Sequence, residues 1–252
     1  MLQFGIIGKP LAQSFSAKYF TEKFLRDGID AEYKMYPIED IKDFPLLCKE
    51  NNFTGLNVTI PYKQSVMQYL DEMDETAKGV GAVNVIKFHE GKLIGYNTDT
   101  CGFRESIRPM LQPIHNQALV LGTGGAAKAV VYALKSMGIK VKMVSRSGDY
   151  DYTYSDLTED IIRDNLLIIN CTPLGMYPQT DACPRIPYDG ITERHLIYDV
   201  IYNPETTLFL QKGKERNAQI CNGLGMLYGQ AEEAWKIWEA PLNLPLEGRL
   251  KT

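Results

Sequence analysis

The fold of this chain is decided by the stretch Leu119-Val120-Leu121-Gly122-Thr123-Gly124-Gly125-Ala126-Ala127-Lys128. The apolar residues before Gly122 predict a buried strand, and the apolar spacing after Ala127 predicts a helix that ends near Gly138. Strand, glycine turn and helix in this order are typical of a dinucleotide site, because the helix N-terminus offers unpaired N–H groups to the phosphates. Gly124 has no Cβ to hold a pyrophosphate away, and Ala127 lets the helix lie close to the sheet.

The same glycines would also suit an ordinary strand-to-helix turn, since turns use glycine for conformational reasons alone. A second predicted strand over Lys140–Ser145 follows where a βαβ unit needs one, and it favours the dinucleotide site. Further elements are predicted downstream: strands over 166–170, 195–200 and 219–221, and helices over 205–216 and 224–238.

The N-terminal half is also predicted to alternate strands and helices. This alternation predicts parallel α/β sheets, two of them if the linker around Pro109 and Pro113 separates two domains. The domain boundary is expected between Thr100 and Asn116. The elements are strands over 2–7, 31–36, 55–60, 81–86 and 93–96, with a hairpin turn over 89–92. The helices are expected over 17–27 and 44–51 and, after Thr100, through Phe103 and Ile107.

The overall composition is that of an ordinary globular protein. The 252 residues are 44% hydrophobic and 23% charged, and the formal net charge is −4. This negative charge argues against broad binding to nucleic acid or to anionic membranes, and no apolar segment is long enough to cross a bilayer. The N-terminus lacks the basic start and the long apolar region of a signal peptide, so a cytoplasmic protein is expected.

Neither the 5 cysteines nor the 3 histidines form a ligand motif. No C-x-x-C pair is present, and reduced thiols in the cytosol are the simplest interpretation of the cysteines. His89, His115 and His195 are far apart in the sequence, so we expect no metal site.

Several polar side chains interrupt the apolar pattern of the N-terminal half. Ser14 and Ser16 precede a predicted helix, so capping explains them, although a hydroxyl pair after the first strand could also hold a polyhydroxylated ligand. Asn57 and Thr59 share one face of a strand. Asn84 interrupts an apolar strand, and its amide needs a backbone or ligand partner if that strand is buried.

Lys63 and Asp99 are candidates for chemistry. If Pro61 begins a helix, Lys63 lies in its first turn, where a positive charge is poorly matched to the positive helix end. Most lysines simply face solvent, so this mismatch is mild support for another role. Asp99 precedes a helix through Phe103 and Ile107, and helix capping alone would explain it. Capping and catalysis are not exclusive.

Several of these stretches together resemble the shikimate dehydrogenase family, whose members reduce 3-dehydroshikimate with NADPH. The resemblance runs nearly from end to end, and the order and joint presence of the motifs make it specific. It rests on the Ser14/Ser16 pair and on Asn57-Val58-Thr59-Ile60-Pro61-Tyr62-Lys63, Gly81-Ala82-Val83-Asn84, Asn97-Thr98-Asp99, Gly122-Thr123-Gly124-Gly125-Ala126, Asn170-Cys171-Thr172-Pro173-Leu174-Gly175-Met176, Asp199-Val200-Ile201-Tyr202-Asn203-Pro204 and Gly225-Met226-Leu227-Tyr228-Gly229-Gln230.

The resemblance implies two α/β domains with a cleft between them: a substrate-binding domain over 1–101, completed by C-terminal helices over 224–252, and a Rossmann-type NADP-binding domain over 102–223. It implies small-molecule partners and a monomer or homodimer. The residues that would surround shikimate are Ser14, Ser16, Asn57, Thr59, Lys63, Asn84, Asp99, Tyr202 and Gln230. Those that would hold the dinucleotide are Gly122, Thr123, Gly124, Gly125, Ala126, Ser145, Arg146, Thr172, Met176, Val200 and Gly225.

By the same resemblance, Lys63 and Asp99 form the catalytic pair. A ketone that is being reduced develops negative charge on its oxygen, to which Lys63 can donate a hydrogen bond and then a proton. In the oxidative direction the lysine must first be neutral. A coupled Lys63–Asp99 pair is therefore preferred to either residue as an isolated base.

The choice of cofactor depends on the end of the second strand in the dinucleotide domain. An NAD site usually has Asp or Glu there, whereas Arg146 can pair with a 2′-phosphate and stack on adenine, which favours NADP. The family commonly has Asn-Arg-Thr and a further basic residue, but here Ser147-Gly148-Asp149 follows. About twenty residues separate Arg146 from Leu167, which predicts an abbreviated adenine side with weak NADP binding or relaxed NAD use.

Three alternatives remain open. A quinate/shikimate dehydrogenase that uses NAD or both cofactors is opposed by Arg146 and supported by Asp149. A non-catalytic binding protein would have no need of Lys63 and Asp99. A methyltransferase that used the glycine loop for S-adenosylmethionine would leave the segment 57–63 unexplained.

Overall fold

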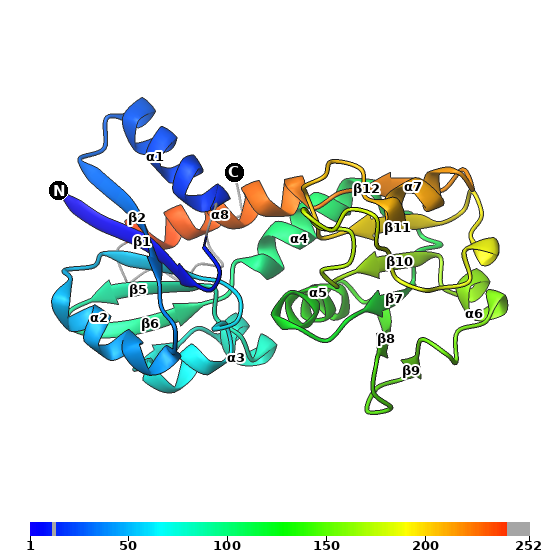
Figure 1. The fold of residues 1–252 in the computed structure, drawn as a ribbon, viewed down its shortest axis with the longest axis horizontal. Coiled ribbons are helices and arrows are strands. Elements are labelled where there is room, and N and C mark those ends of the chain that lie inside the picture. Colours follow the sequence, from blue (N-terminus) through cyan, green and yellow to red (C-terminus); the bar gives the residue numbers. More distant parts are fainter. Residues whose placement is uncertain (12–13, 241–252) are drawn as a thin grey trace. The chain divides into compact units, whose positions relative to one another are not determined.

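The computed structural model describes residues 1–11 and 14–240, and the chain divides into two compact units (Figure 1). The first unit holds Met1–Ala77, Val83–Thr98 and the chain from Ala231 onward, and the second holds Lys78–Ala82 and Asp99–Gln230. Each of two sheets has six strands. The predicted fold class, an α/β chain with two sheets, is confirmed. Part of the C-terminal segment that was expected to be helical, 241–252, lies outside the described residues.

The sheet of the first unit has the strand order β2-β1-β3-β5-β6-β4 and is mixed. β1 is parallel to β2 and β3, whereas β5 is antiparallel to both β3 and β6. Parallel sheets were predicted, and for this unit the prediction is wrong, although the hairpin turn predicted over 89–92 is confirmed. The tight turn at Glu90 and Gly91, whose φ angles are 50° and 76°, makes β6 antiparallel to β5, because so short a connection cannot cross over to a parallel strand. The alternation of elements did not predict that β5 is also antiparallel to β3. The strands are Leu2–Gly8, Ala31–Pro37, Gly55–Val58, Glu72–Met73 (β4), Val85–His89 (β5) and Lys92–Tyr96 (β6).

Helices cover both faces of this sheet. One face packs on α1 (Phe15–Asp27) and α8 (Leu224–Glu239) through a buried aromatic cluster that includes Phe4, Phe20, Phe24, Trp235 and Trp238. The other face packs on α2 (Phe44–Glu50) and on the 3-10 helix Ser65–Tyr69, through Ile7, Phe44, Leu56 and Val66.

The sheet of the second unit is fully parallel, with the order β12-β11-β10-β7-β8-β9. Alternate residues of β7 enter two separate cores, as expected for a strand that is buried on both faces. Val120 packs with α4 and α5, and Leu121 packs with α6 and α7. The strands are Gln117–Leu121 (β7), Lys140–Ser145 (β8), Tyr152–Thr153 (β9), Leu167–Asn170 (β10), Leu196–Asp199 (β11) and Gln219–Cys221 (β12); the helices are Asp99–Ile107 (α4), Gly125–Ser136 (α5), Glu159–Asp164 (α6) and Leu208–Lys214 (α7).

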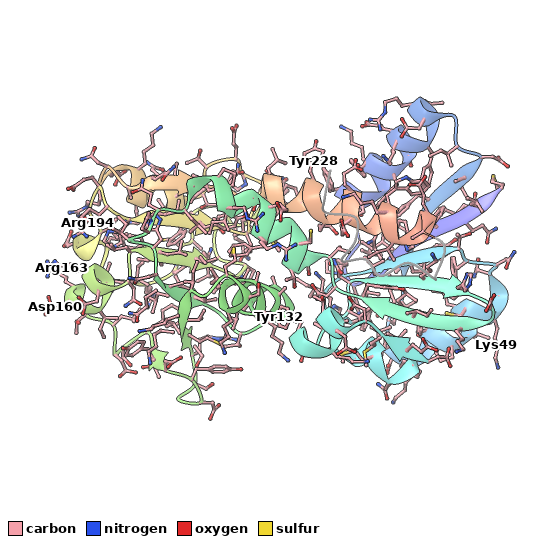
Figure 2. The ribbon with its side chains drawn as sticks, turned by 180° about the vertical axis from the view of Figure 1, so that it is seen from behind. Lys49, Tyr132, Asp160, Arg163, Arg194 and Tyr228 are labelled. Carbon is pink, nitrogen blue, oxygen red and sulfur yellow. The ribbon has the colours of Figure 1, made fainter. Side chains whose placement is uncertain are left out.

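The short helix α3 (Glu75–Val80) passes from one unit to the other. Val80 and Ala82 are buried with Ala129 of α5. A Cβ added to Gly79 would lie 2.4 Å from the ring of Tyr132, which is labelled in Figure 2. This close packing on α5 explains why residues 78–82 belong to the second unit.

Two predicted elements near the polar residues are wrong in their details. Lys63 does not lie in an α-helix: it lies in a tight turn before the 3-10 helix, where the N–H of Tyr62 donates to the carbonyl of Thr59 at 2.9 Å. The strand predicted to begin at Gly81 begins at Val85, because Gly81 has a φ of 68° and turns the chain. Lys63 is therefore not at the N-terminus of an α-helix, and the mismatch between its charge and a positive helix end no longer supports a special role for it.

Candidate functional site

Most of the polar candidates of the first unit meet at one edge of its sheet. β1 and β3 are parallel and pair Ile7 with Val58 near their carboxyl ends. β5 begins beside the end of β3, since Asn57 pairs with Val85, and β6 ends opposite the same Val85. The segments that follow β1, β3 and β6 and precede β5 thus lie at the same edge, where α/β proteins commonly bind ligands.

A buried chain of hydrogen bonds holds the amides of Asn57 and Asn84. The hydroxyl of Tyr33 donates to Asn57 Oδ1 at 2.6 Å, and Asn57 Nδ2 donates to the carbonyl of Asn84 at 3.3 Å. Asn84 Nδ2 donates to Thr98 Oγ1 at 2.9 Å, and its Oδ1 accepts from the Thr98 N–H at 2.7 Å. Both amides are almost fully buried, so their orientation is set before any ligand arrives.

The two serines have different local roles. Ser14 is the N-cap of α1, and its hydroxyl accepts from the N–H of Ala17 at 3.3 Å, as the capping interpretation predicts. Ser16 is buried near Tyr33; burial raises the pKa of Tyr33, and the Ser16 hydroxyl opposes the rise. Thr59 follows β3 and is half-buried. Ser16 therefore joins the cluster of Asn57 through a shared tyrosine.

Lys63 and Asp99 come from different parts of the fold. The backbone carbonyl of Lys63 accepts from the N–H of Val83 at 2.7 Å, which ties its turn to the residue before Asn84. Asp99 is buried and is the first residue of α4, directly after Thr98. It begins the longer segment of the second unit, Asp99–Gln230, whereas Lys63 belongs to the first unit.

The remaining substrate candidates, Tyr202 and Gln230, lie in the second unit. Gln230 is buried in α8, and its Nε2 donates to the carbonyl of Leu227 at 3.0 Å. Tyr202 follows β11 and is partly exposed, and burial of the rest of its ring raises the pKa of its phenol.

The glycine turn of the second unit has the conformation that a phosphate loop requires. Gly122 has a φ of 105°, and a Cβ there would lie 3.2 Å from the backbone of Cys171. Gly124 is the N-cap of α5, and a Cβ there would meet nothing within 4 Å, which leaves room above the helix end. The first turn of α5, which begins with Gly125 and Ala126, carries no acidic residue, so an anion is not repelled. Ala127 is fully buried against the sheet.

The region expected to hold adenine is short. Ser145 ends β8 and donates to the carbonyl of Ser147, and the exposed Arg146 lies between them. The chain then forms only the 2-residue strand β9 and the 6-residue helix α6 before β10 begins. The connection from β8 to β10 is therefore as short as the sequence spacing predicts. Arg146 is the basic residue nearest in sequence to the end of β8.

The other cofactor candidates lie in loops at the carboxyl ends of the parallel strands. Thr172 and Met176 follow β10, and Val200 follows β11. Met176 is 45% exposed, which suits a residue that contacts a ligand. Gly225 is in the first turn of α8, where a Cβ would lie 3.0 Å from Ser106 of α4. This glycine therefore also has a packing role.

Several residues of these clusters escaped the sequence prediction. Tyr33 looked like a core residue of a strand, and Thr98 was not distinguished from its motif neighbours. Asn170 and Asp199 end buried strands, and both are fully buried in spite of their polar side chains. The sequence did carry a signal for Asn170 and Asp199, because a polar residue at the end of an apolar strand in an α/β chain indicates a position at the ligand-binding edge of the sheet.

Among the described residues, no group of three or more His, Cys, Asp or Glu side chains could hold a metal ion. A search of the same residues finds no helix that is both long and apolar enough to cross a membrane.

Comparisons with known proteins agree with this architecture. A family model described as the shikimate dehydrogenase substrate binding domain matches residues 6–86. The shikimate dehydrogenase (NADP(+)) of Clostridium beijerinckii is 42% identical over 94% of this chain and 91% of its own.

Solved structures are similar over nearly the whole chain. The shikimate 5-dehydrogenase of Thermus thermophilus in complex with NADP(H) and shikimate has a TM-score of 0.85 and 30% identity, over 95% of this chain and 94% of its own. The Listeria monocytogenes enzyme in complex with shikimate and NAD has a TM-score of 0.83 and 27% identity, over 94% and 91%. The chain belongs to the shikimate dehydrogenase family.

Proposed function

We propose that this chain is an NADP-dependent shikimate dehydrogenase, which reversibly reduces 3-dehydroshikimate to shikimate in the biosynthesis of aromatic amino acids. The observation that carries the proposal is its 42% identity, over 94% of its length, to an enzyme of that activity. The buried amides and hydroxyls of the first unit and the open glycine turn of the second supply the chemistry that this reaction needs.

The substrate is recognised by groups that match a carboxylate and several hydroxyls. Asn57, Asn84, Thr59, Ser14 and Ser16 present amides and hydroxyls at one sheet edge, and Gln230 and Tyr202 add to them from the second unit. The two amides are held in fixed orientations by buried hydrogen bonds, so a substrate that lacked a matching hydroxyl would lose its own hydrogen bonds to them. Such a loss discriminates strongly between close analogues.

Lys63 and Asp99 handle the proton. In the reductive direction Lys63 donates a hydrogen bond to the ketone oxygen and then its proton, while the carbonyl carbon receives hydride and becomes the alcohol carbon. Asp99 then passes a proton taken up from solvent to the neutral lysine. In the oxidative direction the same pair takes the hydroxyl proton, so the atoms balance in both directions.

The second unit fits a dinucleotide. The open space at Gly124 and the acid-free first turn of α5 suit the pyrophosphate, and Arg146 suits the 2′-phosphate of NADP. Thr172, Met176, Val200 and Gly225 are assigned to the nicotinamide end. When bound, the nicotinamide supplies or accepts the hydride.

The test is shikimate oxidation with NADP, followed by the absorbance of NADPH, in the wild type, Lys63→Ala and Lys49→Ala. Lys49 is an exposed lysine of the same unit and serves as the matched control (Figure 2). We expect Lys63→Ala to bind shikimate nearly normally and to lose turnover by about 10²- to 10⁴-fold, the usual value of general acid–base catalysis. Unchanged turnover would remove Lys63 from the mechanism, and an inactive wild type would refute the proposed activity.

A second candidate is a quinate/shikimate dehydrogenase that uses NAD or both cofactors. The short adenine region and Asp149 favour it, and the Listeria relative was solved with shikimate and NAD. Parallel assays with quinate and with NAD distinguish the two candidates. Activity on quinate comparable to that on shikimate would favour the second.

We further propose that the protein acts in the cytoplasm as a monomer or homodimer. The 5 cysteines form no disulfide bonds with one another, which suits a reducing compartment. Light scattering at several protein concentrations measures the oligomeric state.

A further inference from the structure

A buried polar network joins the ends of two neighbouring strands in the second unit. Asn170 ends β10 and Asp199 ends β11, and the two residues face each other in the parallel register. Asn170 Nδ2 donates to Asp199 Oδ1 at 3.1 Å, and neither residue has measurable exposure. The two strand ends are thus linked through side chains as well as through the backbone.

Each of these residues also holds the loop that follows it. Asp199 Oδ1 accepts from the N–H of Ile201 at 3.1 Å, and Asp199 Oδ2 accepts from Thr207 Oγ1 at 2.6 Å. Asn170 Oδ1 accepts from both the N–H and the hydroxyl of Thr172, at 2.9 Å and 2.6 Å. The loops 171–176 and 200–207 therefore depend on one carboxylate and one amide.

The two loops also contact each other and the glycine turn. The N–H of Tyr177 donates to the carbonyl of Asn203 at 3.2 Å. A Cβ added to Gly175 would lie 3.5 Å from Thr207, and one added to Gly122 would lie 3.2 Å from Cys171. A shift at Asp199 would therefore reach the segments that carry the assigned cofactor residues.

We propose that Asp199 is a positioning residue for the cofactor, which acts through Asn170 and Thr207 to fix the two loops that hold the nicotinamide end. This inference rests on the proposed function, because the role of those loops comes from it. Asp199 itself touches neither hydride nor substrate in this scheme.

The charge state of Asp199 gives the proposal a distinctive signature. Burial raises the pKa of Asp199 to about 6, against the lowering effect of Thr207, Ile201 and Asn170. The titratable groups whose charge interacts with it are Cys171, Tyr188 and Tyr198; burial raises the pKa of each, so they stay neutral at neutral pH.

The network suits the ionised carboxylate. An ionised Asp199 accepts all three donors, whereas a protonated carboxyl carries an O–H that faces donors. Protonation should therefore loosen the loops, and the KM for NADP should rise as the pH falls through about 6. Cofactor binding should in turn favour the ionised form.

The experiment measures KM for NADP, KM for shikimate, kcat and thermal stability from about pH 5 to about pH 8 in the wild type and Asp199→Asn. The 2′-phosphate of NADP also titrates near pH 6, but it does so in both proteins, so the difference between them isolates Asp199. We expect Asp199→Asn to raise KM for NADP by about tenfold at high pH, the value of one hydrogen bond to a charged group. The KM of Asp199→Asn for shikimate should stay within about twofold of the wild-type value. Its KM for NADP should lack the part of the rise near pH 6 that comes from protonation of Asp199.

Two further variants keep the test decisive if Asp199→Asn does not fold. Thr207→Ser keeps the hydroxyl and should behave as the wild type, whereas Thr207→Val should raise KM for NADP. Thr207 also caps α7 by accepting from the N–H of Leu210, at 3.3 Å. Thr158→Val removes the equivalent cap of α6, where Thr158 accepts from the N–H of Ile161, without touching the network.

Two results would show that Asp199 has a merely structural role. In the first, Asp199→Asn raises the KM for NADP and the KM for shikimate equally. In the second, the KM for NADP of Asp199→Asn depends on pH as it does in the wild type. The same conclusion would follow if Thr207→Val matched Thr158→Val, with lower stability and an unchanged KM for NADP. Titration of NADPH fluorescence measures cofactor binding without turnover. A wild type that binds NADPH but does not oxidise shikimate would refute the proposed function and still allow the Asp199 comparison to be made.

Discussion

Single residues in this protein combine a local structural role with a proposed chemical one. Ser14 caps α1 through the N–H of Ala17 and is also a substrate candidate. Asp99 is the first residue of α4 and is also a proton-transfer candidate. Helix ends suit both tasks, because they hold a polar side chain on a rigid element.

Arg146 tests the cofactor preference at the scale of one residue. Arg146→Ala should weaken NADP binding by about 10- to 100-fold, because hydrogen bonds between a charged donor and a phosphate are lost. NAD, which has no 2′-phosphate, should be affected much less. Calorimetric titration with both cofactors measures the difference, and Arg194→Ala, at an exposed arginine of the same unit (Figure 2), is the control. Equal losses for both cofactors would exclude the 2′-phosphate role.

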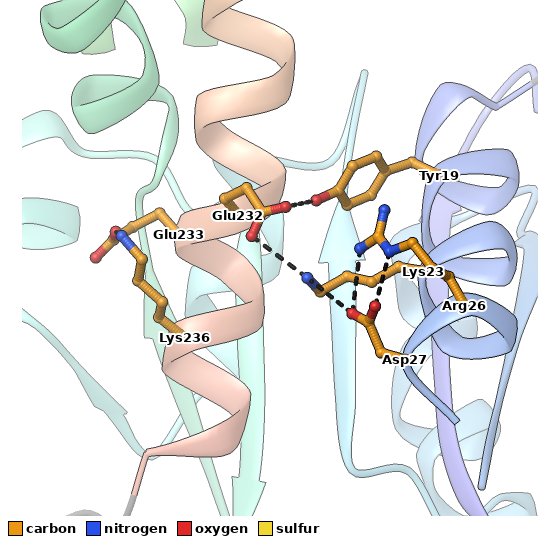
Figure 3. A network of polar contacts seen from close by, with 7 residues as sticks. All are labelled: Tyr19, Lys23, Arg26, Asp27, Glu232, Glu233 and Lys236. Carbon is orange, nitrogen blue, oxygen red and sulfur yellow. Dashed lines mark hydrogen bonds and ion pairs between the residues drawn. The ribbon is translucent and has the colours of Figure 1, made fainter. Parts of the chain in front are cut away.

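At the scale of elements, α8 is attached to the first unit by several kinds of contact. Trp238 Nε1 donates to the carbonyl of Ile86 at 3.0 Å. Glu232 of α8 accepts from Tyr19 and from Lys23 of α1, and Lys23 also pairs with Asp27 (Figure 3). Lys23 is buried but its partner Glu232 is about half exposed, and ion pairs that reach solvent contribute little, so the fully buried contacts carry most of the attachment.

Lys87 is the clearest of these buried contacts. It is 5% exposed, and its Nζ donates to the carbonyl of Ile237 at 2.9 Å and to that of Ala240, so it caps the C-terminus of α8. Lys87→Met keeps the apolar stem but leaves these carbonyls unpaired. We expect it to destabilise the first unit by about 1–3 kcal/mol.

Denaturant unfolding followed by tryptophan fluorescence measures this effect, because both tryptophans, Trp235 and Trp238, lie in α8 within the first unit. Lys92→Met, at an exposed lysine on the neighbouring strand β6, is the control. A loss no larger than that of the control would show that the cap contributes little.

At the scale of the whole molecule, stability should depend on pH through two buried histidines of the second unit. Burial lowers the pKa of both His115 and His195. His195 accepts from the N–H of Thr192 at 3.0 Å, and its other ring nitrogen contacts the carbonyl of Ile162 at 3.0 Å. The neutral ring satisfies both contacts, because one nitrogen accepts and the other donates.

The sign follows from proton binding. The unfolded chain takes up protons near the usual histidine pKa of about 6.5, and the folded chain takes them up only at lower pH. The free energy of unfolding should therefore fall as the pH drops below about 7, by at most about 1.4 kcal/mol per pH unit for each histidine. Asp199 has the opposite effect: because its pKa is raised in the folded chain, its protonation adds to the free energy of unfolding as the pH falls from about 6 toward about 4.

Urea unfolding from about pH 5.5 to about pH 8, followed by circular dichroism, measures this dependence. His195→Gln should flatten it, whereas His89→Gln, at the β5–β6 hairpin of the first unit, should leave it unchanged. An unaltered slope in His195→Gln would contradict the assignment.

The sequence by itself determined the features that follow from local rules. The glycine turn, the stop of α5 before Gly138 and the hairpin at Glu90–Gly91 depend on backbone angles that few residues adopt, so their positions are visible in the sequence. The apolar strands of the parallel sheet follow from burial on both faces. The motifs around Lys63 and Asp99 likewise identified the family, because their order is a property of the sequence.

Only the tertiary structure decided which distant side chains share a hydrogen bond. Lys87 lies 150 residues from Ile237, and Asn170 lies 29 residues from Asp199. Whether such residues meet depends on strand order and register, which are fixed when hydrophobic faces are buried together and not by any local pattern. The same cause decides whether a polar residue at a strand end is exposed, or is buried and paired as Asp199 is.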